Sequence, residues 1–394
     1  MAANSDNVFD NVIDLPVPGA ALETSALPPG GGVYAFMDEN DSVLQTIGTQ
    51  SLRRSIHHRL SPPDDAKRRR GADLRAIARR VRWTPTFSVF ETYLAYLNIA
   101  RRLTPDRYRK ELAFGPVWFA RVDPNERFPR WQTDTVALST SGVDVGPFRD
   151  RSHCAAFVEL LEDLFDLCRR HDILVRAPNG RRCVYFEMGK CPAPCDGSIS
   201  PDAYRDAIGR SIDFATGGHE LHLQGLEQQM RLAAAAQAYE RAAYIKDTLA
   251  RARKLLRSDG RLTPTPEQFR FLIVQRAGGT SRVKPFFVNR GAISVGEQVR
   301  LKGLGEAVPA WLAEFGQLES APQPDAVYGS ECIWLVSHFL LKGDKAPGLF
   351  LPASRLDDPS EVARQVDSRF RRPRRQSENM RDTGPAVPEV DPGP

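Results

Sequence analysis

Three cysteines lie close together in the stretch Cys183-Val-Tyr-Phe-Glu-Met-Gly-Lys-Cys191-Pro-Ala-Pro-Cys195, near the middle of this 394-residue chain. Thiolates at such short spacings can converge on one metal centre. Six cysteines are too few for a disulfide framework in a chain of this length, and the N-terminus lacks the features of a secretory signal. We therefore expect a cytoplasmic protein whose clustered thiols bind metal; buried reduced thiols on a loop are the alternative.

The residues after the cysteines, about 201–256, favour helices. Residues 220–254 are rich in Ala, Leu, Gln, Glu and Arg, which are strong helix formers. Apolar residues recur on one face of each half, for example at Leu226 and Met230 and again at Ala243 and Leu249. Two amphipathic helices so close in sequence predict an αα-hairpin whose apolar faces pack together.

The composition indicates a globular protein of about two or three domains. The apolar fraction is 41%, and the longest apolar run, Cys332–Leu341, is too short to cross a bilayer, so no membrane association is expected. Residues 1–30 hold four acidic residues and no base, which predicts a disordered leader; the arginine-rich and proline-rich end predicts a disordered tail.

A basic block lies between Arg53 and Arg82, where eleven Lys or Arg residues accompany three Asp residues. Such a block is typical of a surface that contacts phosphates, so we predict that it binds DNA; a solvated helix face beside a loop is the alternative. The candidate DNA-binding residues are Arg53, Arg54, Arg59, Lys67, Arg68, Arg69 and Arg70.

The remaining pattern predicts an α+β fold. The pattern predicts a β-hairpin at Gly32–Met37 and Val43–Gly48, followed by helices at about 72–81 and 89–102. After residue 263 it predicts strands, among which we count the apolar run Cys332–Leu341. We divide the chain into a leader (1–27), a small α/β domain (28–110), a linker with the cysteines (111–200), the helical hairpin region (201–257), a small α+β domain (263–355) and the tail (356–394).

In this order of segments the chain resembles, over roughly residues 25–255, the UvrC subunit of the bacterial nucleotide-excision-repair nuclease. In that family a GIY-YIG nuclease domain is followed by a cysteine cluster and a helical UVR hairpin. Gly32-Val33-Tyr34 is similar to the first nuclease motif, whereas Thr46-Ile47-Gly48 has threonine where the second motif has its water-activating tyrosine. An aliphatic hydroxyl has a much higher pKa than a phenol and is a poor base near neutral pH.

Two further positions of the resemblance are substituted. Ser55 takes the place of the family's catalytic arginine, although Arg54, or Arg53, is near enough to replace it. Tyr96 takes the place of the metal-binding glutamate, while Glu91 matches an earlier glutamate of the same motif. A neutral phenol is a poor ligand for a hard cation, which speaks against a bound Mg²⁺. The candidate catalytic residues are therefore Tyr34, Arg54 and Arg53, with Thr46, Ser55 and Tyr96 at substituted positions.

The other two segments resemble the family more closely. Met188-Gly189-Lys190-Cys191-Pro-Ala-Pro194-Cys195 is close to the family pattern, and Cys168 stands near a fourth cysteine position. The resemblance implies a [4Fe–4S] cluster on Cys168, Cys183, Cys191 and Cys195, with zinc as the alternative because it accepts the same ligands. Cys154 and Cys332 are expected in the core.

The hairpin resembles the UVR motif, which in relatives docks on the UvrB helicase subunit. The implied partner-binding residues are Leu226, Met230, Tyr239, Glu240, Ala243 and Asp247. Intramolecular packing is the alternative, because the same apolar stripe could dock on the C-terminal domain, and both readings can hold together.

UvrC proteins continue into an RNase H-like nuclease domain and helix-hairpin-helix modules, and we see no acidic triad for such a domain after the hairpin. Two hypotheses follow. The first is a non-cleaving or weakly active UvrC-like protein that binds DNA and a UvrB-like partner. The second is a divergent, metal-dependent GIY-YIG endonuclease that makes a single-strand incision at damaged DNA. A redox-responsive regulator is a third idea.

Overall fold

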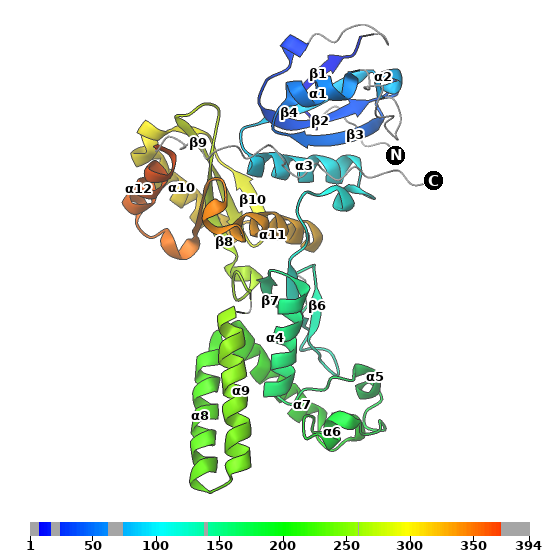
Figure 1. Ribbon diagram of the computed structural model, residues 1–394, viewed down its shortest axis with the longest axis vertical. Helices are drawn as coiled ribbons and strands as arrows, with labels where there is room; N and C mark the ends of the chain where they lie inside the picture. Colours follow the sequence, from blue (N-terminus) through cyan, green and yellow to red (C-terminus); the bar gives the residue numbers. More distant parts are fainter. Residues whose placement is uncertain (1–7, 17–23, 62–73, 138–140, 259, 372–394) are drawn as a thin grey trace.

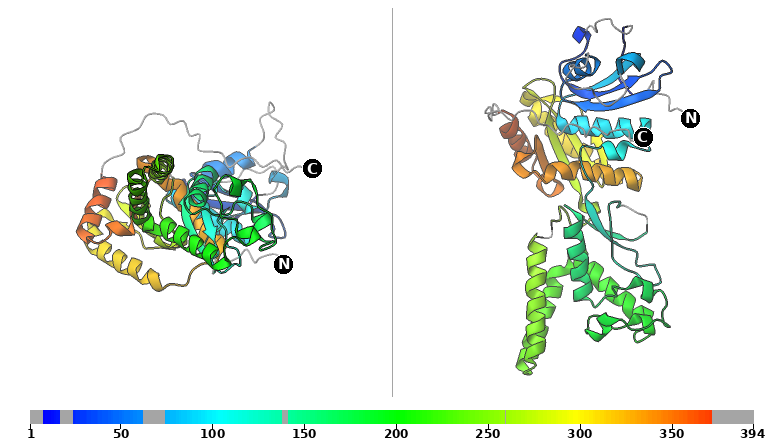
Figure 2. Two further views of the ribbon diagram at one scale, coloured as in Figure 1. Left: turned by 90° about the horizontal axis from the view of Figure 1, so that it is seen from below. Right: turned by 45° about the vertical axis from the view of Figure 1, so that its right-hand side comes forward.

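The computed structural model describes residues 8–16, 24–61, 74–137, 141–258 and 260–371. The molecule is elongated and has three modules (Figure 1). The N-terminal and C-terminal modules lie together at one end, and the middle module extends away from them and ends in a helical hairpin, as the rotated views in Figure 2 also show. The sheets are antiparallel, and most helices follow one another along the chain instead of alternating with single strands, so the predicted α+β class is confirmed.

The N-terminal module is a four-stranded antiparallel sheet with the strand order β1–β4–β2–β3. The predicted hairpin is confirmed, with Tyr34 opposite Ile47 and Ala35 opposite Thr46. Helix α1 packs on the face that carries Tyr34, and α3 packs on the other face. The elements are β1 (Asn11–Asp14), β2 (Gly31–Met37), β3 (Val43–Thr49), α1 (Leu52–Leu60), α2 (Leu74–Ile77), β4 (Arg80–Thr86) and α3 (Val89–Leu103).

The middle module joins a small sheet of order β6–β5–β7 to a group of helices that share one hydrophobic core. Its elements are β5 (Trp118–Val122), β6 (Gln132–Asp134), β7 (Val143–Phe148), α4 (Arg151–Leu164), α5 (His171–Leu174), α6 (Val184–Glu187), α7 (Pro201–Asp213), α8 (His219–Ala235) and α9 (Tyr239–Ser258). Helices α8 and α9 form the predicted αα-hairpin.

The C-terminal module has a sheet of order β10–β9–β8–β12, to which β11 adds by pairing with β9. Helices α10 and α12 pack on one face of this sheet and α11 packs on the other. The elements are β8 (Arg270–Arg276), β9 (Arg282–Asn289), β10 (Ala292–Val295), β11 (Val299–Arg300), α10 (Leu304–Gln317), α11 (Ala326–Leu340), β12 (Leu349–Pro352) and α12 (Pro359–Arg371).

Helix α3 belongs to the cores of both terminal modules. Its Phe90 ring lies 5.1 Å from the ring of Phe286 on β9 and 5.4 Å from that of Phe339 on α11, between ring centroids. On the same helix, Glu91 forms an ion pair of 2.6 Å with Lys284 of β9. Segments nearly 200 residues apart in sequence are therefore joined by one buried core and one ion pair.

Two predictions for the first 81 residues need correction. Part of the leader forms β1, which pairs antiparallel with β4, and Asp14 there forms an ion pair with Arg80. The helix predicted at 72–81 is only the short α2, and the chain then enters β4, where Val81 and Trp83 alternate into the core. The alternation was hidden because arginines occupy the positions between them. The other residues of the predicted leader, 1–7 and 17–23, lie outside the described residues.

Two predictions near the end of the chain also need correction. The apolar run Cys332–Leu341 lies almost entirely in α11, which is buried nearly all round; a short apolar run gives no period that separates helix from strand. Part of the predicted disordered tail forms α12, which buries Val362, Val366 and Phe370. This spacing of four residues makes one apolar stripe in a segment that is otherwise rich in charge. Residues 372–394 lie outside the described residues.

Among the described helices, none combines the length and the apolar character that crossing a bilayer requires.

Candidate functional site

The first candidate site surrounds Tyr34 on β2. Its side chain is fully buried between β2 and α1, and its hydroxyl group lies 2.8 Å from the Oγ of Ser55. Burial raises the pKa of Tyr34 above its ordinary value, against smaller opposing effects of Ser55 and Arg59. Tyr34 therefore stays protonated near neutral pH and acts as a hydrogen-bonding group of the core.

Helix α1 carries the arginines that were predicted to act beside Tyr34. Arg53 donates from Nε and Nη2 to the carbonyl oxygen of Leu27, at 2.9 and 2.7 Å. Arg54 lies on the exposed face of the helix. The guanidinium that reaches the Tyr34 hydroxyl is instead Arg59, one turn after Ser55, which also donates to Gln45 at 3.0 Å. The spacing of four residues from Ser55 could have indicated Arg59, because such residues share a helix face.

The other substituted positions lie on the opposite side of the sheet. Thr46 pairs with Ala35 and so points towards α3, where its Oγ1 is buried without a hydrogen-bond partner in the described structure. Tyr96 on α3 donates its hydroxyl to Glu111 at 3.0 Å, and burial followed by the Glu111 charge raises its pKa.

Glu91, which matches an earlier glutamate of the motif that contains Tyr96, has partners of its own. Glu91 is 9% exposed, and one carboxylate oxygen binds Lys284 while the other accepts the main-chain N–H of Phe87 at 2.8 Å. The sheet thus separates Tyr34, Ser55 and Arg59 from Thr46 and Tyr96. The structure does not bring the predicted catalytic positions together into one site.

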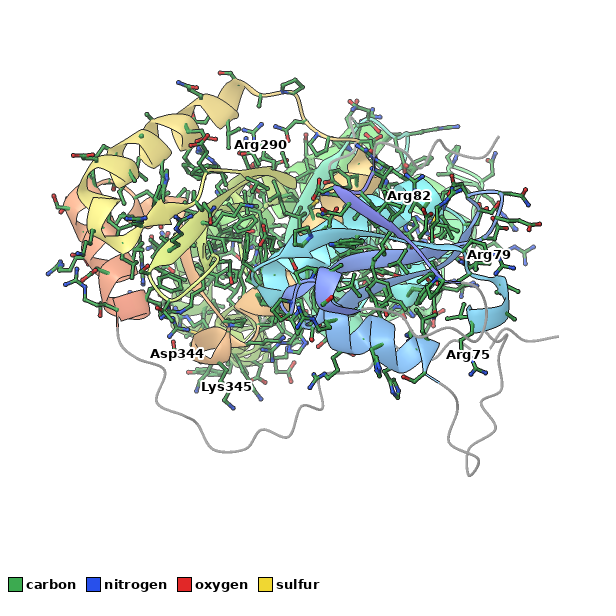
Figure 3. The ribbon with its side chains drawn as sticks, turned by 90° about the horizontal axis from the view of Figure 1, so that it is seen from above. Arg75, Arg79, Arg82, Arg290, Asp344 and Lys345 are labelled. Atoms are coloured by element: carbon green, nitrogen blue, oxygen red, sulfur yellow. The ribbon has the colours of Figure 1, made fainter. Side chains whose placement is uncertain are left out.

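Much of the described basic block is used within the N-terminal module. Arg80 forms an ion pair of 2.6 Å with Asp41, and Arg82 forms one of 3.4 Å with the same carboxylate. Arg79 donates to main-chain carbonyls of α2 and its following turn. Figure 3 shows Arg75 and Arg79 at the end of the N-terminal module that lies farthest from Asp344 and Lys345.

Four of the predicted DNA-binding residues, Lys67, Arg68, Arg69 and Arg70, lie outside the described residues. DNA binding by these four and by Arg53, Arg54 and Arg59 therefore stays a prediction.

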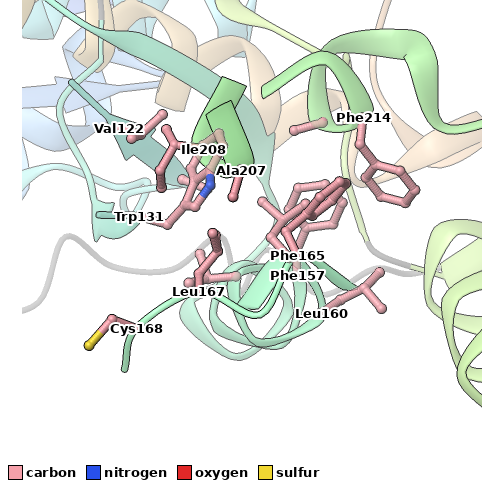
Figure 4. Packing of buried hydrophobic residues seen from close by; sticks show 14 of the residues in the cluster. Val122, Trp131, Phe157, Leu160, Phe165, Leu167, Cys168, Ala207, Ile208 and Phe214 are labelled. Carbon is pink, nitrogen blue, oxygen red and sulfur yellow. The ribbon is translucent and has the colours of Figure 1, made fainter. Parts of the chain in front are cut away.

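The second candidate site is the cysteine-bearing loop of the middle module. Cys168 follows the end of α4 in the packed core shown in Figure 4, Cys183 precedes α6, and Cys191 and Cys195 flank a turn in which Ala193 has a left-handed backbone, with φ 55°. The amide N–H of Gly180 donates to the carbonyl of Cys195 at 2.8 Å, and a Cβ at Gly180 would lie 2.8 Å from that same oxygen. Only glycine permits this close approach.

An ion-pair network holds the same loop against α4. Asp163 binds Arg169 at 2.6 Å and Arg251 of α9 at 3.0 Å, and lies 3.6 Å from the ammonium of Lys190. Arg169 also donates to the carbonyl of Lys190 at 3.1 Å. Since Arg169 follows Cys168 and Lys190 precedes Cys191, these bonds keep the two cysteines adjacent.

The thiols interact with one another. Cys168, Cys191 and Cys195 are buried and Cys183 is half-buried. The Cys168 thiol donates to the carbonyl oxygen of Arg170 at 3.6 Å. Its interaction with Cys191 raises the pKa of Cys168 and lowers that of Cys191 to about 7. Burial, followed by the negative charge of Asp196, raises the pKa of Cys195.

These residues fit a thiolate-bound metal in ligand type. Within the part of the chain that the structure describes, however, no three His, Cys, Asp or Glu side chains are gathered closely enough to hold a metal ion as they stand. Metal binding stays a prediction. Cys154 and Cys332 are buried in two different cores, as expected, and burial raises the pKa of each to about 12.

The third candidate site is the α8–α9 hairpin. Its inner side, including Leu223, Ile245 and Leu249, is buried in the core of the middle module with α4 and α7. The alternative of intramolecular packing is therefore confirmed for this stripe, but the stripe packs on the middle module and not on the C-terminal domain, from which the hairpin projects away in Figure 1. Arg253 and Glu227 form an ion pair between the two helices.

The predicted partner-binding residues of the hairpin differ in exposure. Leu226 and Met230 are half-buried beside the core, whereas Glu240, Ala243 and Asp247 are exposed. Tyr239, the first residue of α9, is 66% exposed, and Leu232 near the end of α8 is 63% exposed. The end of the hairpin therefore presents apolar side chains to solvent.

Two protein-family models match parts of the chain. The model described as "UvrC/Cho excinuclease, middle domain" matches residues 117–214, and the model described as "UvrB/uvrC motif" matches residues 223–255. These ranges cover the cysteine-bearing region and the hairpin on which the resemblance was based. The resemblance to UvrC is therefore confirmed over both segments.

Curated relatives carry the name UvrABC system protein C. The one from Desulforudis audaxviator is 24% identical over 382 residues, covering 94% of this chain and 61% of that protein. The one from Methanothermobacter thermautotrophicus is 27% identical over 303 residues, covering 73% and 49%. The one from Natronomonas pharaonis is 30% identical over 226 residues, covering 57% and 37%.

The chain thus spans between 37% and 61% of the length of these three relatives. No solved structure matches the chain.

Proposed function

We propose that this chain is a cytoplasmic, DNA-binding protein of nucleotide excision repair that docks on a UvrB-like helicase subunit through the α8–α9 hairpin and does not cut DNA, or cuts it weakly. The observation that carries the proposal is the hairpin itself: it matches the UvrB/uvrC motif and exposes Tyr239 and Leu232 at its end. An apolar surface on a helical hairpin is suited to pairing with another amphipathic helix.

The N-terminal module supports the non-cleaving form of the proposal. Incision needs a base that deprotonates water, a cation near the developing charge and a carboxylate-bound metal. Tyr34 is buried and protonated, and Glu91 is neutralised by Lys284. A scaffold of this kind suits contacts with DNA better than phosphodiester chemistry.

A titration with a purified UvrB-type subunit tests the docking. Tyr239→Asp places a charge in the apolar surface and should weaken binding at least about tenfold, because buried aromatic anchors dominate such interfaces. An acidic residue at the start of α9 favours the helix, so the variant should fold. Leu221→Ser is the matched control: Leu221 is 78% exposed on the same hairpin but far from its end. Equal affinity of Tyr239→Asp and the parent protein would exclude this docking mode.

One observation favours the alternative, a divergent metal-dependent endonuclease. Arg59 reaches Tyr34 from the helix on which the family places its catalytic arginine. Incubation of the protein with damaged and branched DNA and Mg²⁺ or Mn²⁺ separates the two functions. We expect no incision; incision that Arg59→Ala abolishes and Arg54→Ala retains would establish the nuclease instead.

We also propose that Cys168, Cys183, Cys191 and Cys195 hold a metal centre, a [4Fe–4S] cluster or zinc. The bound centre would cross-link the loop to the end of α4. The arrangement of buried, mutually interacting thiols supports this role.

A further inference from the structure

A cavity of about 1060 Å³ lies between the two terminal modules. One wall is formed by the residue after β3 and the turn from β4 to α3, and the other by the end of β8, the segment before β12 and α12. Ligand sites occur preferentially at such interfaces between domains, and this volume is at the upper end of their usual range.

The charged side chains that line the cavity are mainly basic. The four cationic residues are Arg276, Lys345, Arg364 and Arg369, and the two anionic residues are Asp344 and Glu361. Four positive and two negative charges leave a net charge of +2 on the lining. Such a lining attracts phosphate groups.

Two of the three guanidinium groups in the cavity lining are held in place without being neutralised, whereas the third, Arg364, pairs with Glu361 of its own helix. Arg276 donates to the carbonyls of Thr280 and Phe370, each at 2.5 Å, and Arg369 donates to those of Gly348 and Ala346, each at 2.8 Å. Among the described residues, neither forms an ion pair with a carboxylate. Their positions are fixed by neutral acceptors, so their charge remains available to an anion.

The cavity also has an aromatic ring and amide groups. Phe87, in the turn before α3, is 49% exposed and lines the cavity. Gln50 and Gln365 line it as well and carry donors and acceptors. An exposed aromatic ring beside cations and amides is the combination that binds a nucleotide, whose base stacks on the ring while its phosphate meets the cations.

The two walls are held in a fixed relation. The Glu91–Lys284 ion pair and the contacts of the Phe90 ring with Phe286 and Phe339 join α3 to the C-terminal module directly behind Phe87. The cavity is thus built into the folded molecule, and a ligand does not have to bring the walls together.

We infer that this cavity binds a segment of single-stranded DNA, with one unpaired base on Phe87 and the adjoining phosphates near Lys345, Arg364 and Arg369. A strand is favoured over a duplex because a base can stack on Phe87 only when it is unpaired. This inference rests on the proposed DNA-binding function and gives the C-terminal module a role in it. The site is separate from Arg53, Arg54 and the rest of the basic block.

The test uses the full chain and an oligothymidine about 12 nucleotides long, a length within the usual site size, with fluorescence anisotropy as the readout. Phe87→Leu removes the ring and should lower the affinity about 5- to 100-fold, the range expected for loss of one stacked base. Phe87→Tyr keeps the ring and should bind like the parent. Because both variants replace the same exposed side chain, a difference between them reports stacking rather than folding.

Charge variants test the phosphate contacts. Lys345→Gln and Arg364→Gln should each reduce the slope of log affinity against log salt concentration by about 0.7, the value for one single-strand phosphate contact. Arg371→Gln is the matched control, since Arg371 is an exposed cation of the same helix α12 but lies outside the cavity lining. Arg371 is ion-paired with Asp367 of its own helix, as Arg364 is with Glu361. Arg371→Gln should leave the slope unchanged.

The outcomes separate this inference from the proposed function. If the parent protein binds neither duplex nor single-stranded DNA, DNA binding itself is wrong and the inference falls with it. If the parent binds DNA but Phe87→Leu and the charge variants bind equally well, only the cavity assignment is overturned. Binding of thymidine monophosphate without binding of the oligonucleotide would assign the cavity to a free nucleotide and also overturn it.

Discussion

The hydroxyl group of Tyr34 lies in the core between β2 and α1, where it meets the Oγ of Ser55 at 2.8 Å and interacts with Arg59. The same tyrosine belongs to a motif that resembles a nuclease active site. Its burial and its protonated state give it a structural role, and the residues that contact it come from the helix expected to carry the catalytic cation. Tyr34 thus matches the family motif in residue type, while its surroundings give it a structural role, which supports the proposal of a non-cleaving protein.

Tyr34→Phe should lower the free energy of unfolding by about 1 kcal/mol, because Ser55 loses a buried hydrogen-bonding partner. Urea denaturation at neutral pH measures the change. Tyr239→Phe, which removes an exposed hydroxyl, should leave the stability unchanged. A stability equal to that of the parent protein would show that the Tyr34 hydroxyl makes no net contribution to folding.

Glu162 on α4 should make the free energy of unfolding depend on pH. Burial raises its pKa to about 7 from 4.5; the Arg169 charge opposes this shift, and Glu159 and Asp163 add to it. A carboxyl group whose pKa is higher in the folded protein binds its proton more tightly there. Stability should therefore fall as the pH rises from about 4.5 to about 7, and then level off.

Glu162→Gln should flatten this dependence and make the protein more stable than the parent above pH 7, because the amide cannot ionise. Urea denaturation at a series of pH values is the measurement. Glu220→Gln, at an exposed position on α8, serves as the control and should retain the slope. A slope that is unchanged in Glu162→Gln would assign the pH dependence to other groups.

At the scale of the elements, a few polar contacts hold the cysteine-bearing loop in its conformation. Asp163 and Arg169 fix it to α4, and the Cys168 thiol donates to the carbonyl oxygen of Arg170. Short elements such as α5 and α6, of four residues each, bury little apolar surface, so the loop depends on these bonds. A bound metal would add cross-links between this loop and the end of α4.

The protein isolated without oxygen should contain iron and acid-labile sulfide, or zinc, and Cys191→Ser should lose most of it, because serine is a poor ligand for either centre. Elemental analysis and the visible absorption spectrum are the readouts. Cys154→Ala removes a buried thiol outside the loop and should keep the parent's metal content. Parent protein that stays metal-free after reconstitution with iron and sulfide, and with zinc, would refute the metal centre.

At the scale of the whole molecule, the main contact between the terminal modules is the packing of the C-terminal module on α3. The C-terminal module shares its core with α3 through Phe90, and Lys284 neutralises Glu91 at the same contact. Helix α3 therefore serves two sheets, and the terminal modules should unfold together rather than separately. This shared core also fixes the walls of the cavity between them.

Lys284→Met should destabilise the protein by about 3 kcal/mol, because Glu91 keeps a buried charge without its partner. The double variant Lys284→Met with Glu91→Leu should recover much of this loss, since no charge remains buried. Differential scanning calorimetry of the full chain measures both. Lys302→Met, at an exposed lysine of the same module, is the control; a loss as large in the double variant as in the single one would contradict the electrostatic cause.

Local periodicity in the sequence was enough to determine the β2–β3 hairpin, helix α3, the α8–α9 hairpin and the α+β class. Each of these depends on residues that are near one another along the chain, so their pattern is readable without the fold. The resemblance to UvrC likewise depends on short motifs around Cys191 and Leu226.

Only the tertiary structure decided what Glu91 and helix α12 contact. Glu91 is used by Lys284, nearly 200 residues away, and Phe370 anchors α12 on a sheet built from much earlier strands. Contacts between distant segments set the charge and the burial of these groups, and no local pattern contains that information.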